Sequence, residues 1–331
     1  MKRIIFLLII SLTMQKTFAQ ELTYAEKLGF PKGAKVLILH VDDVGMSYDS
    51  NLGAIKAITD GAATSLSMMM PCSWIPGFFH YLKDHPETDA GLHLTLTSEW
   101  DDYRWGPLAG KSSTPGLVDK EGAMWHSVEE TVQHASADEV EKEIKAQLDR
   151  ATTMGWKPTH IDSHMGTLFG SKEFLERYIK LGIENGIPVM FPGGHNTMIF
   201  KTSATGLTLE MTTAIGKKLW DAGLPVLDDL HNISYGWSPP KTNAKLTDQE
   251  LQAYKTKKYI ETIDQLKPGI TMVIMHCTWP SEIFGQISES GDSRKGDALA
   301  MMDPAFKKYL QSNNIILTSW RELKKRRDAV K

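Results

Sequence analysis

The sequence predicts an α/β fold, in the form of a single-domain irregular (β/α) barrel with a long lid-like insertion. From Lys35 onward, short apolar runs alternate with segments of helical period, a pattern typical of a mostly parallel sheet wrapped by helices. About eight apolar runs occur, and their spacing fits one barrel better than two domains. A doubly wound open sheet is the alternative architecture.

The expected strands are apolar runs with turn residues at their ends. They cover residues 36–39, 63–69, 91–96, 159–163, 187–191, 225–227, 270–275 and 315–317. Helices are expected between them, and short polar residues mark where these helices begin. The expected start residues are Asp49 or Ser50, Asp138, Ser171, and Thr247 with Glu250 in a capping-box pattern.

One segment breaks the alternation. Residues 97–136 show no clean period and are rich in Gly, Pro, Ser, Asp and Trp. A stretch of this length between compact elements is usually a functional loop, so we expect it to form a lid.

The first 19 residues have the features of a secretory signal peptide. Lys2 and Arg3 precede an apolar run over residues 4–12, and Ala19 supplies a small residue for cleavage before Gln20. The run is too short to span a membrane, which takes about 20 apolar residues. We therefore expect an exported protein, periplasmic or extracellular, whose barrel domain covers residues 20–331; an uncleaved amphipathic start is the alternative.

The composition excludes several classes of protein. The 331 residues are 41% hydrophobic, with 40 acidic against 37 basic side chains, which is typical of a globular protein and not of a disordered chain or a coiled coil. The one basic run, residues 324–327, is too small for a nucleic-acid-binding face, so no such partner is expected. Cys72 and Cys277 could form a disulfide after export or remain packed thiols, and the oligomeric state is open.

Histidines and aspartates concentrate where the expected strands end. In parallel α/β folds these ends form the rim of the active site. Two histidines and one carboxylate with open positions would make a catalytic site for one divalent metal ion, with zinc the most suitable and magnesium or manganese as alternatives. The residues concerned are His40, Asp42, Asp43, His93, His160, Asp162, His164, Asp228, Asp229, His231 and His276.

Local geometry distinguishes some of these residues. His160 and His164 share one face of a strand, and only the residue at the top can reach the rim, so His164 is favoured. Asp42 and Asp43 would point to opposite faces of a regular strand. Their use at one site requires a backbone turn, with which Gly45 is compatible.

Several motifs in order resemble the YdjC-like carbohydrate deacetylases, the family of chitooligosaccharide deacetylases. The similarity covers roughly residues 36–276. It rests on Asp42-Asp43-x-Gly45, on Gly61 with Thr64 and Ser65, on residues 91–97 (GLHLTLT), on residues 117–122, on residues 160–164 (HIDSH), and on His276.

The resemblance implies a deformed barrel that holds one divalent metal and hydrolyses the N-acetyl group of an acetylated amino sugar. By the same resemblance, Asp43, His93 and His164 correspond to the metal ligands. Asp42 corresponds to the general base and His276 to the acid group.

The sequence departs from the family pattern near the expected substrate. His40-Val41 stands where Asn-Ala is usual, and Met190-Phe191-Pro192 replaces a segment that often holds an arginine. Apolar faces of sugars pack well on indole, so we expect Trp100, Trp105 and Trp279 to contact substrate, with packing of the core or of loops as the alternative role. Arg294 lies in a polar stretch, and we favour a surface position for it over a substrate contact. The roles of His160, Asp162 and His231 are open.

Two other functions are compatible with these residues. One is a different metal-assisted hydrolase, such as an amidase, an esterase or a phosphoesterase. The other is a catalytically silent carbohydrate-binding protein, although the intact Asp and His set argues against it.

Overall fold

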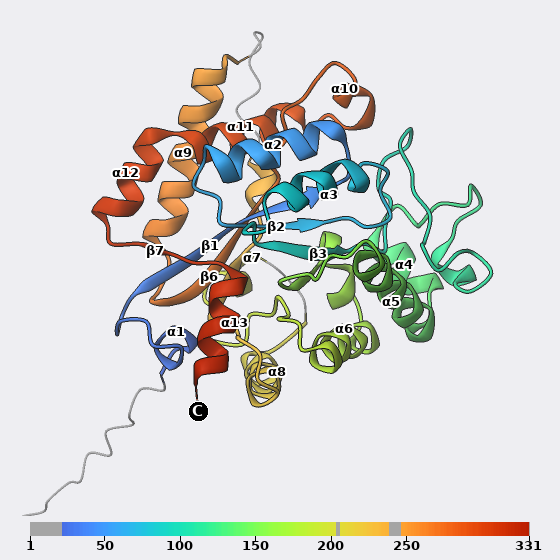
Figure 1. Ribbon diagram of the computed structural model, residues 1–331, viewed down its shortest axis with the longest axis horizontal. Coiled ribbons are helices and arrows are strands. Elements are labelled where there is room, and N and C mark those ends of the chain that lie inside the picture. Colours follow the sequence, from blue (N-terminus) through green and yellow to red (C-terminus); the bar gives the residue numbers. More distant parts are fainter. Residues whose placement is uncertain (1–21, 203–205, 238–245, 331) are drawn as a thin grey trace, which may run out of the picture.

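The computed structural model describes residues 22–202, 206–237 and 246–330, and the expected signal peptide lies outside them. In these residues, parallel strands form a sheet of order β4-β3-β2-β1-β6-β5, and β7 pairs with the first part of β1 (Figure 1). The strands are β1 (Lys35–Val44), β2 (Ser65–Met68), β3 (Ala90–Leu94), β4 (Ile161–Ser163), β5 (Asp229–His231), β6 (Gly269–Met275) and β7 (Ile316–Leu317).

Two parallel bridges close this sheet into a ring. Ile161 of β4 pairs with Val189, and Pro192 pairs with Leu227, which leads directly into β5. The two edges of the sheet are thus joined through residues 189–192, so the predicted irregular barrel is confirmed and the open sheet is not formed.

Two expected strands are reduced to these bridges. Residues 187–191 and 225–227 form no regular strand in the structure, and each takes part in a single bridge. Pro188, Pro192 and Pro225 each lack a backbone N–H, so a continuous ladder cannot form along these segments.

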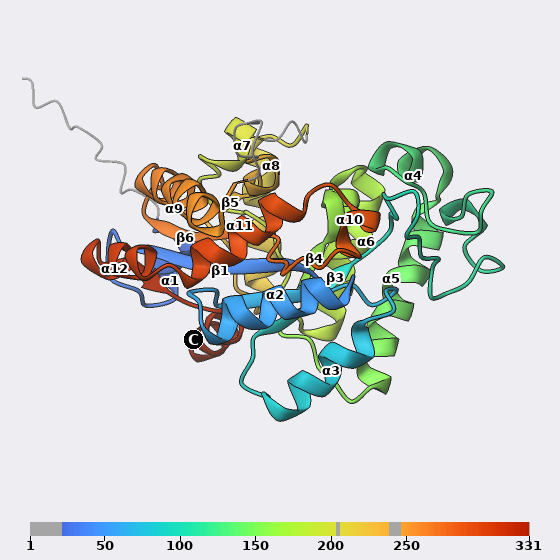
Figure 2. The ribbon, with the colours of Figure 1, turned by 90° about the horizontal axis from the view of Figure 1, so that it is seen from above.

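Helices surround the ring. Helices α2, α9 and α11 lie side by side along one part of it, and α5 and α6 pack together along another (Figures 1 and 2). The longer helices are α2 (Tyr48–Thr59), α3 (Ile75–Asp84), α5 (Ala137–Thr153), α6 (Lys172–Asn185), α8 (Leu209–Asp221), α9 (Asp248–Asp264), α11 (Gly291–Met302), α12 (Pro304–Ser312) and α13 (Trp320–Ala329). Shorter pieces are α1 (Tyr24–Lys27), α4 (Val128–His134), α7 (Ile199–Thr202), α10 (Phe284–Ile287) and the 3₁₀ segments η1 (Pro115–Leu117), η2 (His164–Phe169) and η3 (Ser234–Gly236). No helix of the described part is long and apolar enough to cross a membrane.

The capping predictions are half right. Ser171 caps α6, and Thr247 with Glu250 forms the predicted capping box at α9. Helix α2 is instead capped by Ser47, and α5 by Ser136. In both cases an earlier serine hydroxyl accepts the orphan N–H of the first turn, and the predicted aspartate lies one or two residues inside the helix.

A buried carboxylate fastens the start of the described chain to the barrel. Asp228 accepts hydrogen bonds from the backbone N–H groups of Tyr24 (2.8 Å), Ala25 (3.0 Å) and Ile270 (2.8 Å). These three donors come from α1 and β6, so one side chain links two elements that are far apart in sequence.

The insertion over residues 97–136 is folded onto the barrel. It contains η1, α4 and an antiparallel bridge between Val118 and Met124. Trp105 anchors it in a small apolar cluster that includes Met46 and Cys72. Cys72 and Cys277 are both free and buried, and burial raises the pKa of each thiol, so the packed-thiol alternative applies.

Candidate active site

The backbone turns sharply where β1 ends. Asp43 adopts a left-handed conformation (φ 64°), and the register of β1 against β2 shifts between Val41 and Val44. This is the turn that the use of both Asp42 and Asp43 at one site requires. Gly45 (φ 88°) continues it, and a Cβ atom there would clash with Ile75.

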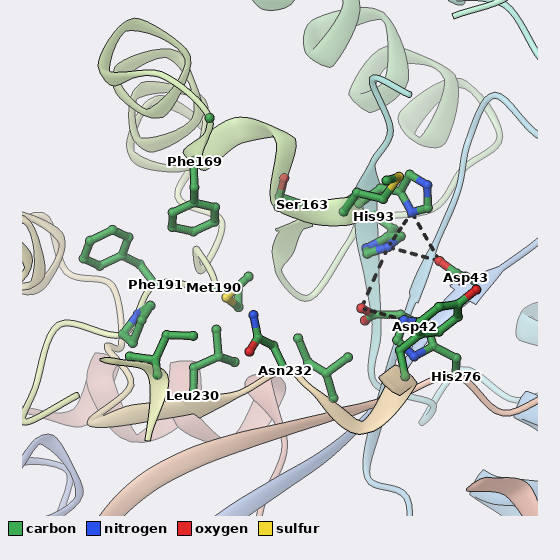
Figure 3. Close-up of a pocket in the computed structure, with 18 of the residues that line it drawn as sticks. Asp42, Asp43, His93, Ser163, Phe169, Met190, Phe191, Leu230, Asn232 and His276 are labelled. Atoms are coloured by element: carbon green, nitrogen blue, oxygen red, sulfur yellow. Dashed lines mark hydrogen bonds and ion pairs between the residues drawn. The ribbon is translucent and has the colours of Figure 1, made fainter. Parts of the chain in front are cut away.

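Asp43, His93 and His164 meet at the ends of β1, β3 and β4. Figure 3 shows Asp43 and His93 directed at one another. Asp43 Oδ1 lies 3.4 Å from His93 Nε2 and 3.3 Å from His164 Nδ1. The two ring nitrogens are 3.3 Å apart. All three side chains are buried, and Asp43 Oδ1 has no hydrogen-bond partner.

This triangle fits a metal ion. Three corners of a tetrahedron around an ion with bonds of about 2.0–2.1 Å are separated by about 3.3–3.4 Å. The donor set of two imidazoles and one carboxylate suits zinc most readily. These three residues could therefore hold a metal.

Two other groups of His and Asp donors in the described residues lie equally close together. They are His40 with His160 and Asp162, and Asp42 with His93 and Asp162. Asp162, His40 and His160 do not line the cavity described below, whereas Asp43, His93 and His164 all do. The latter three thus form the group that a ligand can reach.

A buried network holds the potential metal ligands in place. Asp162 Oδ1 is 2.7 Å from His93 Nδ1, which leaves Nε2 directed at Asp43. Burial alone would lower the pKa of His93, but Asp162 and Asp42 raise it well above its usual range. Carboxylates that draw a proton onto a buried imidazole will also attract a cation.

His40 connects this network to Asp42. Its Nε2 lies 3.1 Å from Asp42 Oδ1 and 2.9 Å from Asp162 Oδ2, and its Nδ1 lies 3.0 Å from Ser65 Oγ. His40 is fully buried, and because neighbouring Asp162 and Asp42 outweigh burial, its pKa is raised to about 9.

His160 lies behind the cluster and has a packing role. Its ring stacks on Trp320 with centroids 5.1 Å apart, and it occupies the space that a Cβ atom at Gly91 would need. Burial lowers its pKa. His231 is also outside the cavity, beside Trp237.

The expected surface position of Arg294 is wrong. Its guanidinium is buried, and Nη1 donates to Asp43 Oδ2 at 2.7 Å while Nε donates to Ser290 Oγ at 2.8 Å. Although burial opposes ionisation of Asp43, this guanidinium helps to hold the pKa of that carboxyl well below its usual range. The polar stretch that contains Arg294 folds into α11, whose start lies against the site.

His276 follows β6 and faces Asp42. Its Nε2 lies 4.0 Å from Asp42 Oδ2, its backbone N–H donates to Asp297 Oδ2 at 3.2 Å, and its Nδ1 has no hydrogen-bond partner. The ring of Tyr235 packs edge-on against it with centroids 5.1 Å apart. Burial lowers the pKa of this imidazole.

Glu99 is part of the site and is missing from the sequence-based set. Its Oε2 lies 3.0 Å from His164 Nε2. It lies two residues after the GLHLTLT motif, at the start of the insertion. Its position directly after a motif expected at the rim of the barrel is the sequence feature that could have identified it as a site residue.

None of the three expected substrate tryptophans lines the cavity of the site. The ring of Trp105 has its centroid 6.5 Å from that of His164, and Trp100 packs on Trp105 and on the Arg294 guanidinium. Trp279 is flanked by two lysine ammonium groups. Their contact with substrate stays a prediction.

A cavity of about 560 Å³ opens beside the cluster. Asp42, Asp43, His93 and His276 gather at one end of it (Figure 3). Its size is within the range of small-molecule sites, about 300–1,000 Å³.

The YdjC-like protein family matches residues 36–312. The chain belongs to this family. The resemblance seen in the motifs is thereby confirmed, and the fold and the buried His and Asp cluster belong to a YdjC-like protein.

Curated relatives in this family are similar over most of the chain. A carbohydrate deacetylase of Thermus thermophilus is 29% identical over 285 residues, which cover 86% of this chain and 92% of the relative. A carbohydrate deacetylase of Thermoanaerobacter pseudethanolicus is 22% identical over 290 residues, 88% of this chain and all (100%) of the relative. A chitooligosaccharide deacetylase of Yersinia enterocolitica is 32% identical over 134 residues, 39% of this chain and 49% of the relative.

A solved structure agrees on the fold. The crystal structure of a proposed cellobiose-phosphate cleavage protein from Enterococcus faecalis V583 superimposes with a TM-score of 0.69 at 19% identity. The match covers 88% of this chain and 99% of that one.

Proposed function

We propose that this YdjC-like protein is a metal-dependent hydrolase that removes N-acetyl groups from acetylated amino sugars or oligosaccharides. The observation that carries the proposal is the triangle of Asp43, His93 and His164, with Asp42 and His276 beside it. The names of the relatives, carbohydrate and chitooligosaccharide deacetylase, support the same reaction.

Asp43, His93 and His164 would hold one divalent ion, with zinc the most suitable and magnesium or manganese as alternatives. A bound divalent ion supplies Lewis acidity, which polarises an amide carbonyl and lowers the pKa of water toward about 7. Asp162 and Arg294 are positioning residues in this scheme, because they contact the ligand side chains.

Asp42 is suited to act as the general base. Its Oδ1 is occupied by His40 at 3.1 Å, while its Oδ2 lies 3.9 Å from His93 Nε2 and 4.0 Å from His276 Nε2. The free oxygen is thus next to the triangle, where it can take a proton from an attacking water.

His276 is suited to protonate the leaving nitrogen. The amine would otherwise depart as an unfavourable anion. Because burial lowers the pKa of His276, its imidazolium gives up a proton readily. The backbone bond to Asp297 fixes the residue. Its Nε2 lies 4.0 Å from Asp42 Oδ2, a gap that one intervening water can bridge, so the proton taken up by Asp42 can pass through that water to the imidazole and from there to the leaving nitrogen.

The test is acetate release by the purified protein loaded with one equivalent of zinc, magnesium or manganese. The substrates are a panel of N-acetylated amino sugars and chitooligosaccharides. We expect activity that a chelator removes and that Asp42→Asn lowers by about 10² to 10⁴. Asp89→Asn is the matched control and should stay active, because it alters a buried aspartate that accepts from the backbone N–H groups of Trp320 and Arg321.

The proposal fails if no substrate of the panel releases acetate, or if Asp42→Asn equals the unaltered protein. Release of phosphate from model phosphoesters in place of acetate would assign a different hydrolase.

We also propose that the protein acts outside the cytoplasm, which rests on residues 1–19 alone. Mass spectrometry of the protein expressed with its natural start should find Gln20 as the first residue. Recovery of the intact start in the cytoplasm would contradict export.

A further inference from the structure

The cavity continues away from the reactive cluster into an apolar arm. We define this arm by Phe169, Met190, Phe191, Ile199, Phe200 and Leu230, all of which line the cavity. Figure 3 shows Phe169, Met190, Phe191 and Leu230 on one side of Asn232, and the Asp and His cluster on the other. A ligand that reaches from the cluster into the arm must therefore carry a second, chemically different part.

The described lining of the arm holds no charged side chain. Among the described residues that line the cavity, the acidic, basic and imidazole side chains are Asp42, Asp43, His93, Glu99, His164, His276 and Arg294, which all belong to the cluster. The one cation, Arg294, already donates to Asp43 and Ser290. A phosphate or carboxylate in the arm would be desolvated without a partner, which is strongly unfavourable.

The arm also offers little to bind a sugar ring. Ser163 Oγ accepts from Leu168 N–H, and Thr212 Oγ1 is bonded to Asn196 Nδ2 and Leu209 O. A ring buried here would lose the bonds of most of its hydroxyls to water, because these side-chain polar groups are few and are already engaged in part. An oligosaccharide chain is therefore a poor occupant.

One acceptor in the wall is free. Asn196 is fully buried, and its Nδ2 donates to Pro192 O at 3.0 Å and Thr212 Oγ1 at 2.8 Å, whereas its Oδ1 has no hydrogen-bond partner. Buried acceptors are normally satisfied, so this oxygen suits an occupant with a single hydroxyl or N–H.

We propose that the apolar arm binds an uncharged alkyl or aryl substituent of the amide substrate. The preferred substrates are then amphipathic N-acylated amino sugars, and plain or phosphorylated sugars are poorer ones. This inference rests on the proposed amide hydrolysis and names its substrate class. The substituent can be carried by the acyl group or by the sugar, and the chemistry of recognition is the same.

The segment that joins the two edges of the sheet contributes directly to this arm. Met190 and Phe191 follow the bridge at Val189, and both line the cavity. Apolar side chains at these positions favour neutral ligands.

The test compares pairs of substrates with the metal-loaded protein. One pair is butyl against methyl N-acetyl-β-glucosaminide, which extends the sugar side. The other is N-butanoylglucosamine against N-acetylglucosamine, which extends the acyl side. Each methylene that is fully buried raises affinity about fourfold, so the longer member of at least one pair should have a kcat/KM about tenfold higher or more.

N-acetylglucosamine 6-phosphate should be hydrolysed at least about tenfold less efficiently than N-acetylglucosamine, because no free cation is found among the described residues that line the arm. The inference is overturned if neither longer substrate is preferred, or if the phosphorylated sugar is preferred.

Two variants test whether the preference for longer substituents depends on the apolar arm. Phe200 is 40% exposed at the arm, so Phe200→Ala should fold and should reduce the preference for the longer substrate several-fold. Leu209→Ala is the matched control, because Leu209 is 49% exposed on α8 and does not line the cavity. An equal loss of preference in both variants would contradict the assignment to the arm.

A binding measurement separates this inference from the proposed reaction. Calorimetry of butyl and methyl N-acetyl-β-glucosaminide with Asp42→Asn reports on the sugar-side occupant even if nothing is hydrolysed. Acetate release without any preference for longer substituents would refute the arm and leave the deacetylase intact. Tighter binding of the butyl compound without acetate release would support the arm and refute the deacetylase.

Discussion

Asp162→Asn should weaken metal binding without unfolding the protein. Asp162 is 1% exposed, and it accepts from His93 Nδ1 at 2.7 Å through Oδ1 and faces His40 Nε2 at 2.9 Å through Oδ2. An asparagine keeps one oxygen and replaces the other by an NH₂ group. It can therefore accept a hydrogen bond from only one of these two imidazoles.

Either orientation of the new amide damages the site. If NH₂ faces His93 Nδ1, the ring proton moves to Nε2, which is the atom directed at Asp43 and can then no longer bind a metal. If NH₂ faces His40, His40 Nε2 must accept a hydrogen bond from the amide and can no longer donate one to Asp42 Oδ1. Loss of such a supporting contact typically costs 10–100-fold in metal affinity, or about 1.4–2.7 kcal/mol.

The assay is competition for zinc with a chromophoric chelator, with urea unfolding of the metal-free proteins measured alongside. We expect the zinc Kd of Asp162→Asn to rise 10–100-fold, while Asp89→Asn, also at a buried aspartate but away from the site, keeps the original Kd. An unchanged Kd in a folded Asp162→Asn protein would refute the role given to this carboxylate, and with it the choice of His93 Nε2 as a ligand atom.

Three further predictions concern acid catalysis, folding and pH. His276→Ala should lower kcat by about 10² to 10⁴ at an unchanged zinc Kd, and a large change in Kd would instead mark it as a ligand. Asp228→Ala leaves three buried N–H groups without their acceptor at about 1–3 kcal/mol each, so urea unfolding should show a loss of at least about 3 kcal/mol, and a loss below about 1 kcal/mol would contradict this. Burial lowers the pKa of His231 to about 4, so the unfolded chain binds its proton first and stability falls as the pH drops from about 6.5 to about 4. Over this pH range, the free energy of unfolding of His231→Gln should therefore fall by roughly 3 kcal/mol less than that of the unaltered protein. Equal falls in the two proteins, measured by urea unfolding, would contradict this.

The sequence is informative where a structural signal is local. The strands β1 and β6 are long apolar runs, and the histidines and aspartates that follow them point to the rim of the barrel. The turn that brings Asp42 and Asp43 to one site is also predictable, because adjacent residues of a strand face opposite ways unless the backbone bends.

Contacts between distant residues explain what the sequence does not reveal. Arg294 pairs with Asp43 across 251 positions, and nothing in its polar neighbourhood distinguishes it from a surface residue. His40 and Asp162 are visible as strand-end residues, but their mutual contact depends on the parallel pairing of β1 to β4 through two other strands. The period of apolar residues predicts helices and strands, but contacts between side chains from different elements are known only once these elements are packed together.

Helix α11 shows why such partners matter for the proposed reaction. Arg294 and Asp297 are three residues apart, so they project from the same face of the helix. The first binds the carboxylate of Asp43, and the second holds the backbone of His276. Lys255 of α9 is buried, and its Nζ lies 2.9 Å from Asp297 Oδ1. The positive charge of this lysine offsets the negative charge of the buried Asp297 carboxylate. One helix thus sets the position of the potential metal ligand relative to the potential acid, and a shift of α11 would disturb both parts of the site together.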